Sequence, residues 1–455
     1  MTLYEKSAIK AAISEIPYLS SAVLAAALIE KDIQTQILDL SISLNPKKDL
    51  LVKLEKFKPT HVGITFTTPL FFEAKNIAKI IKRFDDEIIL ICGGAHSTAL
   101  PRETLERTDF NILCYGEGDK TIVEIIQASS VKDLKKIKGI FYKEDNKIKI
   151  NPPVQLIENL NTLPLPAWHL YDLKKYRASK LSAKGSPVGP IETSRGCVYG
   201  CTYCNKKIFG KCFRFKSVKR VVEEFEHLKK SGFNEIHVWD DMFTTHMPRA
   251  KEICDEIVKR NIKIPWALTC GIRVNNVDQE IFYKLKKAGC HAVYFGVESG
   301  DQKILDRVKK GITLIQAKKA VKMAKKAGLE TVTFFMLGLP GETKESIKKT
   351  INFAIELDSD YAKTTILTPY PGTPIFEEWD KKGHITTKDW SKYNFHSASR
   401  VYDHPNLSWD ELEKAYKRFH RKFYFRPRYI INRFTKDIKT GFLFWDIYYT
   451  LKTFL

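Results

Sequence analysis

Strand-like and helical patterns alternate along most of this chain, and the alternation runs in two separate series. In the first series, short apolar runs at 61–66, 87–92 and 110–114 alternate with helical patterns. Such alternation predicts parallel strands that are covered by helices on both faces of a sheet. The expected helices are 21–30, 72–82 and 120–127, and another short apolar run covers 35–40.

The second series begins near residue 187 and completes six strand–helix units. Six consecutive units fit a partial barrel of the TIM type better than a second open sheet, and functional residues are expected on the loops that follow the strands. The expected strands are 189–194, 235–239, 266–270, 292–297, 331–336 and 363–367.

Between the two series lies a hairpin-like stretch, followed by a segment that contains Pro152, Pro153, Pro164 and Pro166. Prolines spaced in this way indicate a linker, and the length of 455 residues fits several domains. The expected fold class is α/β, with a Rossmann-like parallel sheet, a partial (β/α)6 barrel and a helical C-terminal tail. The expected boundaries are 1–135 for the Rossmann-like domain, 136–186 for the hairpin and linker, 187–375 for the barrel and 376–455 for the C-terminal helical region.

A formal net charge of +22 narrows the function only slightly. A basic excess attracts nucleic acid, anionic membrane surfaces or phosphorylated substrates. The nine cysteines of so long a chain do not form the pattern of a secreted disulfide scaffold. The first residues show no signal-peptide pattern, and no apolar run reaches the ~18 residues of a membrane-spanning helix. A cytoplasmic, reducing location is therefore expected.

Three cysteines lie within eight residues, directly after the first strand of the second series. The run reads Cys197-Val-Tyr-Gly-Cys201-Thr-Tyr-Cys204, on a loop that also contains Gly196. Three thiolates so close together can converge on one soft metal centre. A structural zinc site needs a fourth ligand, for which Cys212 is the candidate, whereas three ligands leave one iron of a cluster open to another molecule.

The spacing Cys-x-x-x-Cys-x-aromatic-Cys resembles the signature of the radical S-adenosylmethionine (SAM) superfamily. In that family the open iron of a [4Fe-4S] cluster binds the methionine end of SAM, and an electron from the cluster splits SAM to give a 5′-deoxyadenosyl radical. The resemblance implies that Cys197, Cys201 and Cys204 hold the cluster. It also implies that Tyr203 lies near the adenine.

Residues on later strand ends resemble the same family. Asp241 follows the second strand, Glu298 and Ser299 follow the fourth, and Gly338 follows the fifth. The resemblance implies that they contact SAM, with Glu298 accepting hydrogen bonds from ribose hydroxyls. Three of these positions also have a plain structural interpretation: a helix cap for Asp241, an exposed ion pair for Glu298 and a tight turn for Gly338.

The first half of the chain resembles the branch of the superfamily that carries a cobalamin-binding domain. The shared motifs are Gly93-Gly94-Ala-His, Gly116-Glu117-Gly118-Asp and the phrase at 159–168, and the resemblance covers roughly residues 17–375. Members of this branch open with an apolar strand, whereas residues 1–16 show no clear strand. The residues expected at cobalamin, on loops where glycine permits close approach, are Thr65, Gly93, Gly94, Gly116, Glu117 and Gly118.

The resemblance implies an enzyme that cleaves SAM and uses the radical for cobalamin-dependent methylation, cyclisation or rearrangement of an unactivated carbon. The alternatives are a cobalamin-independent radical SAM enzyme, methylthiotransferase-like or oxidative, and a non-enzymatic zinc protein that binds nucleic acid. The expected partners are a small-molecule or lipid substrate and an electron donor such as flavodoxin or ferredoxin. No residue is assigned to catalysis.

The tail has an unusual composition. Residues 414–434 interleave Arg and Lys with Phe and Tyr, and residues 442–455 are strongly apolar but too short to span a bilayer. Packing of the tail against the barrel is the favoured interpretation. Peripheral contact with an anionic membrane is the second and would add membrane association to the cytoplasmic location. Stacking on nucleic acid is the least favoured.

Overall fold

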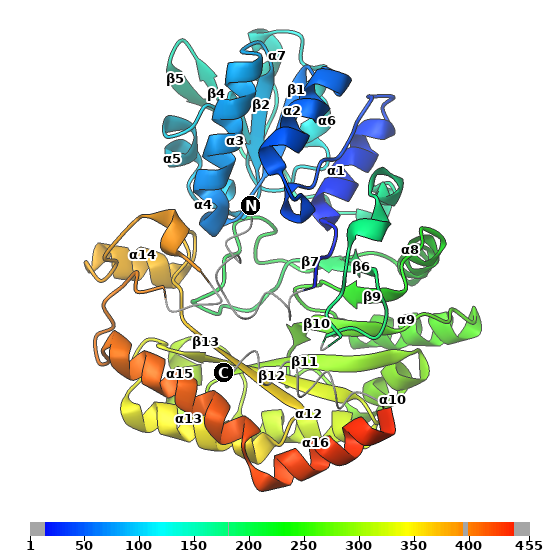
Figure 1. The fold of residues 1–455 in the computed structure, drawn as a ribbon, viewed down its shortest axis with the longest axis vertical. Helices are drawn as coiled ribbons and strands as arrows, with labels where there is room; N and C mark the ends of the chain where they lie inside the picture. Colours follow the sequence, from blue (N-terminus) through cyan, green and yellow to red (C-terminus); the bar gives the residue numbers. More distant parts are fainter. Residues whose placement is uncertain (1–13, 181, 395–398, 441–455) are drawn as a thin grey trace.

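The computed structural model describes residues 14–180, 182–394 and 399–440, and within 435–440 only the backbone is described. Two sheets organise this part of the chain: the first lies at the top of Figure 1 and the second, larger sheet lies below it. Helices pack along both sheets, as the alternation of patterns predicted. The expected α/β class and its order of parts are confirmed.

The first sheet has the strand order β1-β2-β3-β4-β5. The strands β1 (His61–Thr65), β2 (Ile89–Gly93) and β3 (Ile112–Cys114) are parallel. The strands β4 (Ile140–Glu144) and β5 (Lys147–Ile150) add to β3 as an antiparallel hairpin. The hairpin that the sequence placed with the linker therefore extends the first sheet.

Helices cover this sheet because their apolar residues recur at helical spacing. In α3 (Phe71–Phe84), Phe71, Ala74, Ala78 and Ile81 are buried on one face. The remaining helices of this half are α1 (Leu19–Ile29), α2 (Pro46–Phe57), α4 (Ala95–Ala99), α5 (Pro101–Glu106), α6 (Thr121–Gln127) and α7 (Val131–Leu134).

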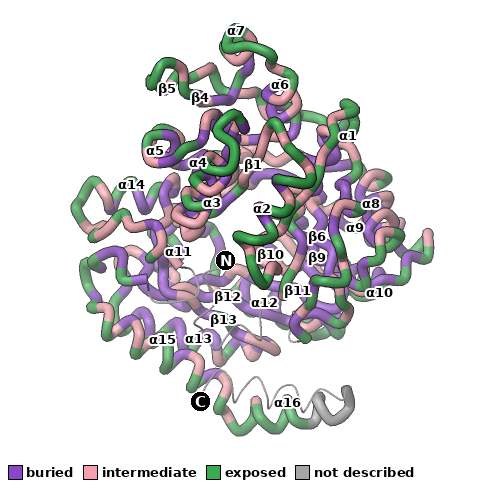
Figure 2. Tube along the Cα trace, turned by 45° about the horizontal axis from the view of Figure 1, so that its top comes forward, coloured by how far each residue is buried: buried purple, intermediate pink, exposed green. Residues whose placement is uncertain are grey.

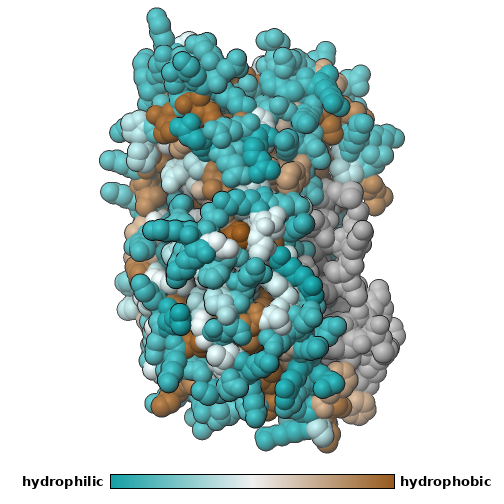
Figure 3. Space-filling model, turned by 90° about the vertical axis from the view of Figure 1, so that its left-hand side faces the viewer, coloured by the Kyte–Doolittle hydropathy of each residue, from teal (hydrophilic) through white to brown (hydrophobic). Residues whose placement is uncertain are grey.

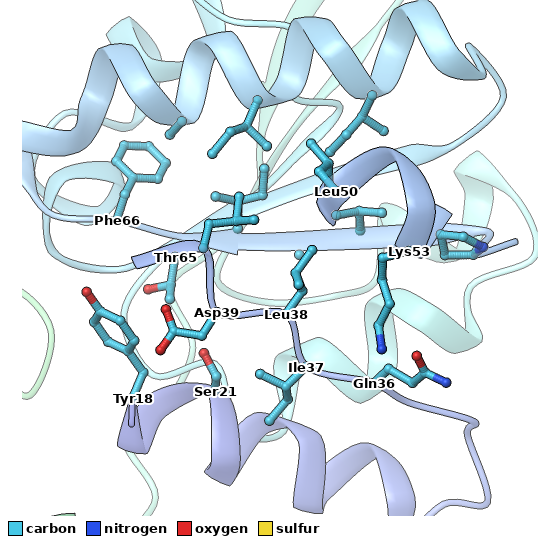
Figure 4. Close-up of a pocket in the computed structure, with 18 of the residues that line it drawn as sticks. Tyr18, Ser21, Gln36, Ile37, Leu38, Asp39, Leu50, Lys53, Thr65 and Phe66 are labelled. Atoms are coloured by element: carbon cyan, nitrogen blue, oxygen red, sulfur yellow. The ribbon is translucent and has the colours of Figure 1, made fainter. Parts of the chain in front are cut away.

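The apolar run at 35–40 does not pair with any strand that the structure describes. It ends in a short 3-10 turn, Leu40–Ile42, in which the Ser41 N–H donates to the Asp39 carboxylate. A cavity of about 300 Å³ separates this run from β1, and its walls are mainly apolar (Figure 4). A first strand near the amino terminus would lie largely within residues 1–13, which are outside the described residues.

The second sheet contains six parallel strands in the order β6-β9-β10-β11-β12-β13, which confirms the expected partial barrel. Its helices lie on the outer side, so that apolar residues of strands and helices share one large core (Figure 1). The strands are β6 (Val188–Ile191), β9 (Glu235–Val238), β10 (Trp266–Ile272), β11 (Cys290–Glu298), β12 (Glu330–Leu337) and β13 (Tyr361–Ile366). The helices are α8 (Val218–Lys230), α9 (Met247–Lys259), α10 (Gln279–Lys287), α11 (Gln302–Arg307), α12 (Leu314–Lys326) and α13 (Lys344–Leu357).

The two faces of the barrel strands differ in burial. On β12, Phe335 and Leu337 are buried in the core under the helices, whereas Phe334 and Met336, which point to the concave face, are only partly buried. On β13, Lys363 of the concave face is exposed. Because successive side chains of a strand point to opposite faces, this alternation shows that solvent reaches the concave face.

The C-terminal region is helical and consists of α14 (Pro374–Lys381), α15 (Trp409–Tyr424) and α16 (Pro427–Thr440). Helix α15 packs on the barrel through the buried Phe419 and Phe423, as the favoured interpretation of the tail predicted. Helix α16 keeps Ile430 and Ile431 exposed, and Figure 2 shows exposed residues along this helix. The apolar segment 442–455 lies outside the described residues.

The outer surface seen in Figure 3 is mostly hydrophilic, with scattered apolar side chains. Among the described helices, none combines the length and the apolar character that crossing a membrane requires.

Candidate active site

The carboxyl ends of both parallel sheets face each other, so the predicted residues of the two halves lie at one interface. The loop after β3 reaches the cysteine loop: a Cβ on Gly116 would lie 3.8 Å from the Ile208 carbonyl oxygen. The segment after β2 reaches the loop after β13, where a Cβ on Gly372 would lie 3.0 Å from Cβ of Ala99. Figure 1 shows β1 and β2 above this interface and the barrel below it.

A buried ion network joins the two halves. The Arg195 guanidinium donates to both carboxylate oxygens of Asp119, at 2.8 and 2.9 Å, and contacts Glu117 at 3.2 Å. Arg214 contacts Glu117 at 2.8 Å. Burial would raise the pKa of Asp119, but Arg195 beside it holds that pKa below the ordinary value. Glu117, predicted at cobalamin, thus serves as an interdomain anchor, a role for which no sequence pattern was available.

The cysteine loop is held by backbone contacts. Gly196 has a φ of +83°, and a Cβ there would overlap the Cys212 carbonyl oxygen. The N–H of Gly196 donates to Asp241 at 3.0 Å. The Lys206 ammonium donates to the carbonyl oxygens of Cys197, at 3.0 Å, and of Tyr199. The loop therefore needs glycine at 196 and is closed by one lysine.

The three cysteines of this loop are brought together. Cys204 is exposed, yet protein atoms around its sulfur raise the pKa of the thiol to about 11; Lys206 opposes this, and Asp241, Cys201 and Cys197 add to it. Both other thiols therefore act on the Cys204 thiol electrostatically. A bound metal would reverse this shift, because a coordinating thiol loses its proton.

The donor set of the loop suits an iron–sulfur cluster. Cysteine thiolates are the usual cluster ligands, and a cluster spaces its ligands more widely than a single ion. Among the described residues, no group of three or more His, Cys, Asp or Glu side chains is close enough to hold one metal ion. The thiol of Cys212 donates to the Phe209 carbonyl oxygen at 3.2 Å. Cys197, Cys201 and Cys204 therefore fit a [4Fe-4S] cluster.

Tyr203 and Glu298, which the sequence predicted at SAM, lie near each other. Burial raises the pKa of Tyr203 well above its ordinary value, and Glu298 and then Cys201 add to this. The Tyr203 hydroxyl is buried without a hydrogen-bond partner in the described part of the chain. Lys310 connects the pair: its ammonium lies 2.8 Å from Glu298 and 5.9 Å from the centre of the Tyr203 ring. An unpartnered hydroxyl beside a carboxylate fits a hydroxyl-bearing ligand such as a nucleoside.

Two acidic residues at the end of β9 hold the turn that leads into the cysteine loop. Asp240 accepts hydrogen bonds from Thr193 and from the Ser194 hydroxyl, the latter at 2.6 Å. The next helix, α9, is capped by His246 instead of by Asp240 or Asp241. Burial raises the pKa of both carboxyl groups. The contact of Asp241 with SAM stays a prediction.

Ser299 and Gly338 have clear packing roles. The Ser299 hydroxyl lies 3.1 Å from the Thr350 hydroxyl. Gly338 donates its N–H to Glu342 at 2.6 Å, and a Cβ there would come within 2.6 Å of the Tyr402 hydroxyl oxygen. Both residues thus support the loops that follow β11 and β12, and their contact with SAM stays a prediction.

Arg273, at the end of β10, is a site residue that the sequence analysis missed. Its guanidinium stacks 3.6 Å from the centre of the Tyr199 ring and donates to the carbonyl oxygens of Lys310 and of Gly311, the latter at 3.0 Å. One of its nitrogens lies 3.9 Å from the sulfur of Cys201. An available signal was its place after the third barrel strand, since the ends of the second, fourth and fifth strands all carry predicted site residues.

The predicted residues of the first sheet share one edge, after β1, β2 and β3. Gly94 has a φ of +98°, and a Cβ there would lie 2.7 Å from the Thr65 hydroxyl oxygen. A Cβ on Gly118 would meet Leu24 at 3.3 Å, whereas Gly93 and Gly116 have room for ordinary contacts. The edge therefore leaves the main chain approachable at Gly93 and Gly116, as a large flat ligand requires.

Three histidines, His96, His237 and His291, are packed inside the protein. His96 is fully buried, and burial, with Arg107, lowers its pKa to about 4. His237 and His291 share the Glu235 carboxylate, at 3.0 and 2.8 Å.

Comparisons with known proteins agree with this geometry. Residues 191–354 match the family model of the radical SAM superfamily, and residues 8–126 match that of the B12 binding domain. These matches exclude the non-enzymatic zinc protein and disfavour a cobalamin-independent enzyme. The cofactors implied by the two families are a [4Fe-4S] cluster, SAM and cobalamin.

Among curated relatives, an uncharacterized methyltransferase of Pyrococcus horikoshii is 36% identical over 438 residues, 95% of this chain and 92% of the relative. An anaerobic magnesium-protoporphyrin IX monomethyl ester cyclase of Rubrivivax gelatinosus is 28% identical, over 85% of this chain and 69% of its own. A cytidylyl-2-hydroxyethylphosphonate methyltransferase of Streptomyces wedmorensis is 28% identical, over 82% and 77%.

Solved structures share the fold. The cobalamin-dependent SAM radical enzyme OxsB superposes with a TM-score of 0.72 at 18% identity, covering 96% of this chain and 70% of that one. The radical SAM methyltransferase TsrM of Kitasatospora setae superposes with a TM-score of 0.68 at 22% identity, covering 82% and 76%. This chain belongs to the radical SAM superfamily, in the branch with a B12 binding domain, and is an enzyme.

Proposed function

We propose that this enzyme transfers a methyl group to an unactivated carbon of a small-molecule substrate and uses cobalamin as the methyl carrier. The observation that carries the proposal is that the cysteine loop and the glycine-rich edge of the first sheet face each other across the buried contact of Arg195 with Asp119. When bound, the cluster and SAM supply a 5′-deoxyadenosyl radical, and cobalamin supplies a methyl group.

The residues of the chain divide this work. The three loop cysteines hold the cluster, and Arg273 fixes the loop through Tyr199. The Tyr203 hydroxyl and Glu298, both near Lys310, orient the nucleoside of SAM. The main chain at Gly93 and Gly116 lets cobalamin lie against the sheet edge.

Cyclisation of the substrate is a second candidate function. It is supported by the similarity to the magnesium-protoporphyrin monomethyl ester cyclase, which spans 85% of this chain. The named substrates of the relatives differ widely in chemistry, so none of them is assigned to this chain. The electron donor we propose is flavodoxin or ferredoxin, in the cytoplasm, with membrane association added if the tail binds lipid.

Anaerobic reconstitution tests the proposal. We expect about four irons and four sulfides per chain, 5′-deoxyadenosine when SAM and dithionite are added, and a change in the visible spectrum of hydroxocobalamin on titration with the protein. Deoxyadenosine without any spectral change at saturating cobalamin would keep the radical chemistry and contradict methyl transfer through cobalamin.

A further inference from the structure

The concave face of the barrel carries a lysine that forms no ion pair or hydrogen bond with any described residue. Lys363 lies in the middle of β13, with its ammonium 5.4 Å from the centre of the Tyr294 ring of β11. The lysine is exposed to solvent, yet the protein atoms around its ammonium lower its pKa below the ordinary value. No carboxylate opposes this shift.

Lys363 differs in this respect from the buried cations of the site. Arg195 is paired with Asp119, and Lys310 is paired with Glu298. A cation crowded by protein atoms without a counter-ion costs stability. Such an arrangement is typical of a place where a ligand supplies the negative charge.

The register of the strands places Lys363 at the level of the predicted SAM site. Lys363 pairs with Phe334 of β12, and Phe334 pairs with Gly296 of β11. The Glu298–Lys310 pair lies directly over Gly296, where a Cβ would meet the two charged groups at 2.8 and 3.0 Å. Two strand spacings therefore separate Lys363 from β11 at this level, about 10 Å.

The same level of the barrel carries glycines on two neighbouring strands. The strands β10 and β11 contribute Gly271 and Gly296 there, and a Cβ on Gly271 would make only ordinary contacts, the nearest at 3.6 Å. Phe334 is only partly buried, so its ring is accessible to a ligand. Nearby on β10, the hydroxyl of Thr269 is buried without a partner among the described residues.

We propose that Lys363 binds a carboxylate or phosphate group of the substrate, whose apolar body lies against Phe334 and Tyr294. The substrate is then an anionic molecule with a flat or apolar part that spans about 10 Å between Lys363 and the predicted nucleoside site. This inference rests on the proposed function, because it takes the concave face of the barrel as the side where substrate binds.

The test uses three matched probes on the full-length reconstituted protein: 2-naphthoate, 2-naphthyl phosphate and the neutral 2-naphthylmethanol. We expect at least one anionic probe to bind about tenfold more tightly than the neutral one, as an ion pair of about 1.4 kcal/mol would give. Comparison of the two anions distinguishes carboxylate from phosphate. In Lys363→Gln this preference should disappear, and in Lys363→Arg it should remain.

Lys319→Gln is the matched control, since Lys319 is an exposed lysine on α12 and should leave the preference unchanged. Acetylation with acetic anhydride, followed by mass spectrometry, locates the probe: the favoured anion should protect Lys363 but not Lys319. Equal binding of all three probes, a preference that persists in Lys363→Gln, or absence of protection at Lys363 would each overturn the proposal.

Formation of 5′-deoxyadenosine by the wild-type protein reports separately on the proposed function. If it fails while Lys363 still selects anions, the radical chemistry is wrong and the anion site stands. If deoxyadenosine forms and the anion preference is absent, only the inference about Lys363 fails.

Discussion

The two strand-end surfaces that face each other are built in different ways. On the barrel side, side chains dominate: three thiols, the Glu298–Lys310 pair, and Arg273 stacked on Tyr199. On the side of the first sheet, the main chain at glycines dominates. The charged Glu117 and Asp119 are already paired with Arg195 and Arg214. The barrel side therefore offers charged and metal-binding side chains to its ligands, whereas the first sheet offers an accessible main chain.

This difference predicts that a single side-chain change can abolish the function of the barrel side. Cys201→Ala should remove one of the three cluster ligands, so that both bound iron and deoxyadenosine formation fall below detection. Iron and sulfide analysis, together with chromatography of the products, measures both. A Cys201→Ala protein that still cleaves SAM at the wild-type rate would contradict the assignment of the loop.

The contact between the two surfaces should be the next most sensitive feature. Asp119→Asn removes one of the three carboxylates that pair with the buried Arg195 guanidinium, the others being Glu117 and Glu192, and we expect a loss of about 1–3 kcal/mol in the free energy of unfolding. Denaturant unfolding measures it. Glu378→Gln breaks the exposed pair with Lys382, and this control should cost about 0–1 kcal/mol. Equal losses in the two variants would show that the buried network does not fasten the halves together.

A substitution on the first sheet should block the space expected for cobalamin without removing any metal-binding side chain. Gly93→Val places a side chain where cobalamin is expected to approach, and we predict about tenfold weaker binding, or about 1.4 kcal/mol. Spectral titration with hydroxocobalamin measures the affinity. Gly63→Val is the control, because a Cβ at Gly63 meets no atom within 4 Å. Unchanged cobalamin binding in Gly93→Val would show that cobalamin does not contact this edge of the sheet.

The smallest effect is expected at the fourth cysteine of the region. The Cys212 thiol donates to the Phe209 carbonyl oxygen, so Cys212→Ala should leave the iron content unchanged. Loss of iron in this variant would restore the reading of a site with four protein ligands.

The sequence predicted the elements of this fold well because apolar periodicity and turn residues are local signals. It did not predict that the hairpin at 140–150 joins the first sheet, since the pairing of β4 with β3 depends on a contact between distant segments. The apolar run at 35–40 has no assigned element in the sequence, and the described structure shows it unpaired beside a cavity.

The candidate site was likewise predicted only where its signals are local. The cysteine spacing is a local motif, and the resemblance that it carries identified the loop. Arg273 and the partners of Glu117 were not found, because their roles arise only when β10 reaches the cysteine loop and when the two halves meet. In the sequence, Lys363 belongs to an ordinary strand pattern, and only the pairing of β13 with β12 shows that it lies on the concave face.

The measurement that tests the central claim most directly is the transfer of an isotopically labelled methyl group. The reconstituted protein is incubated with SAM that carries a 13C-methyl group, hydroxocobalamin and a reductant, and the corrinoid product is examined by mass spectrometry. Labelled methylcobalamin, formed together with 5′-deoxyadenosine by the wild type, is the result we predict. Deoxyadenosine together with unmethylated cobalamin would contradict the claim that the two facing surfaces act in one methyl-transfer reaction.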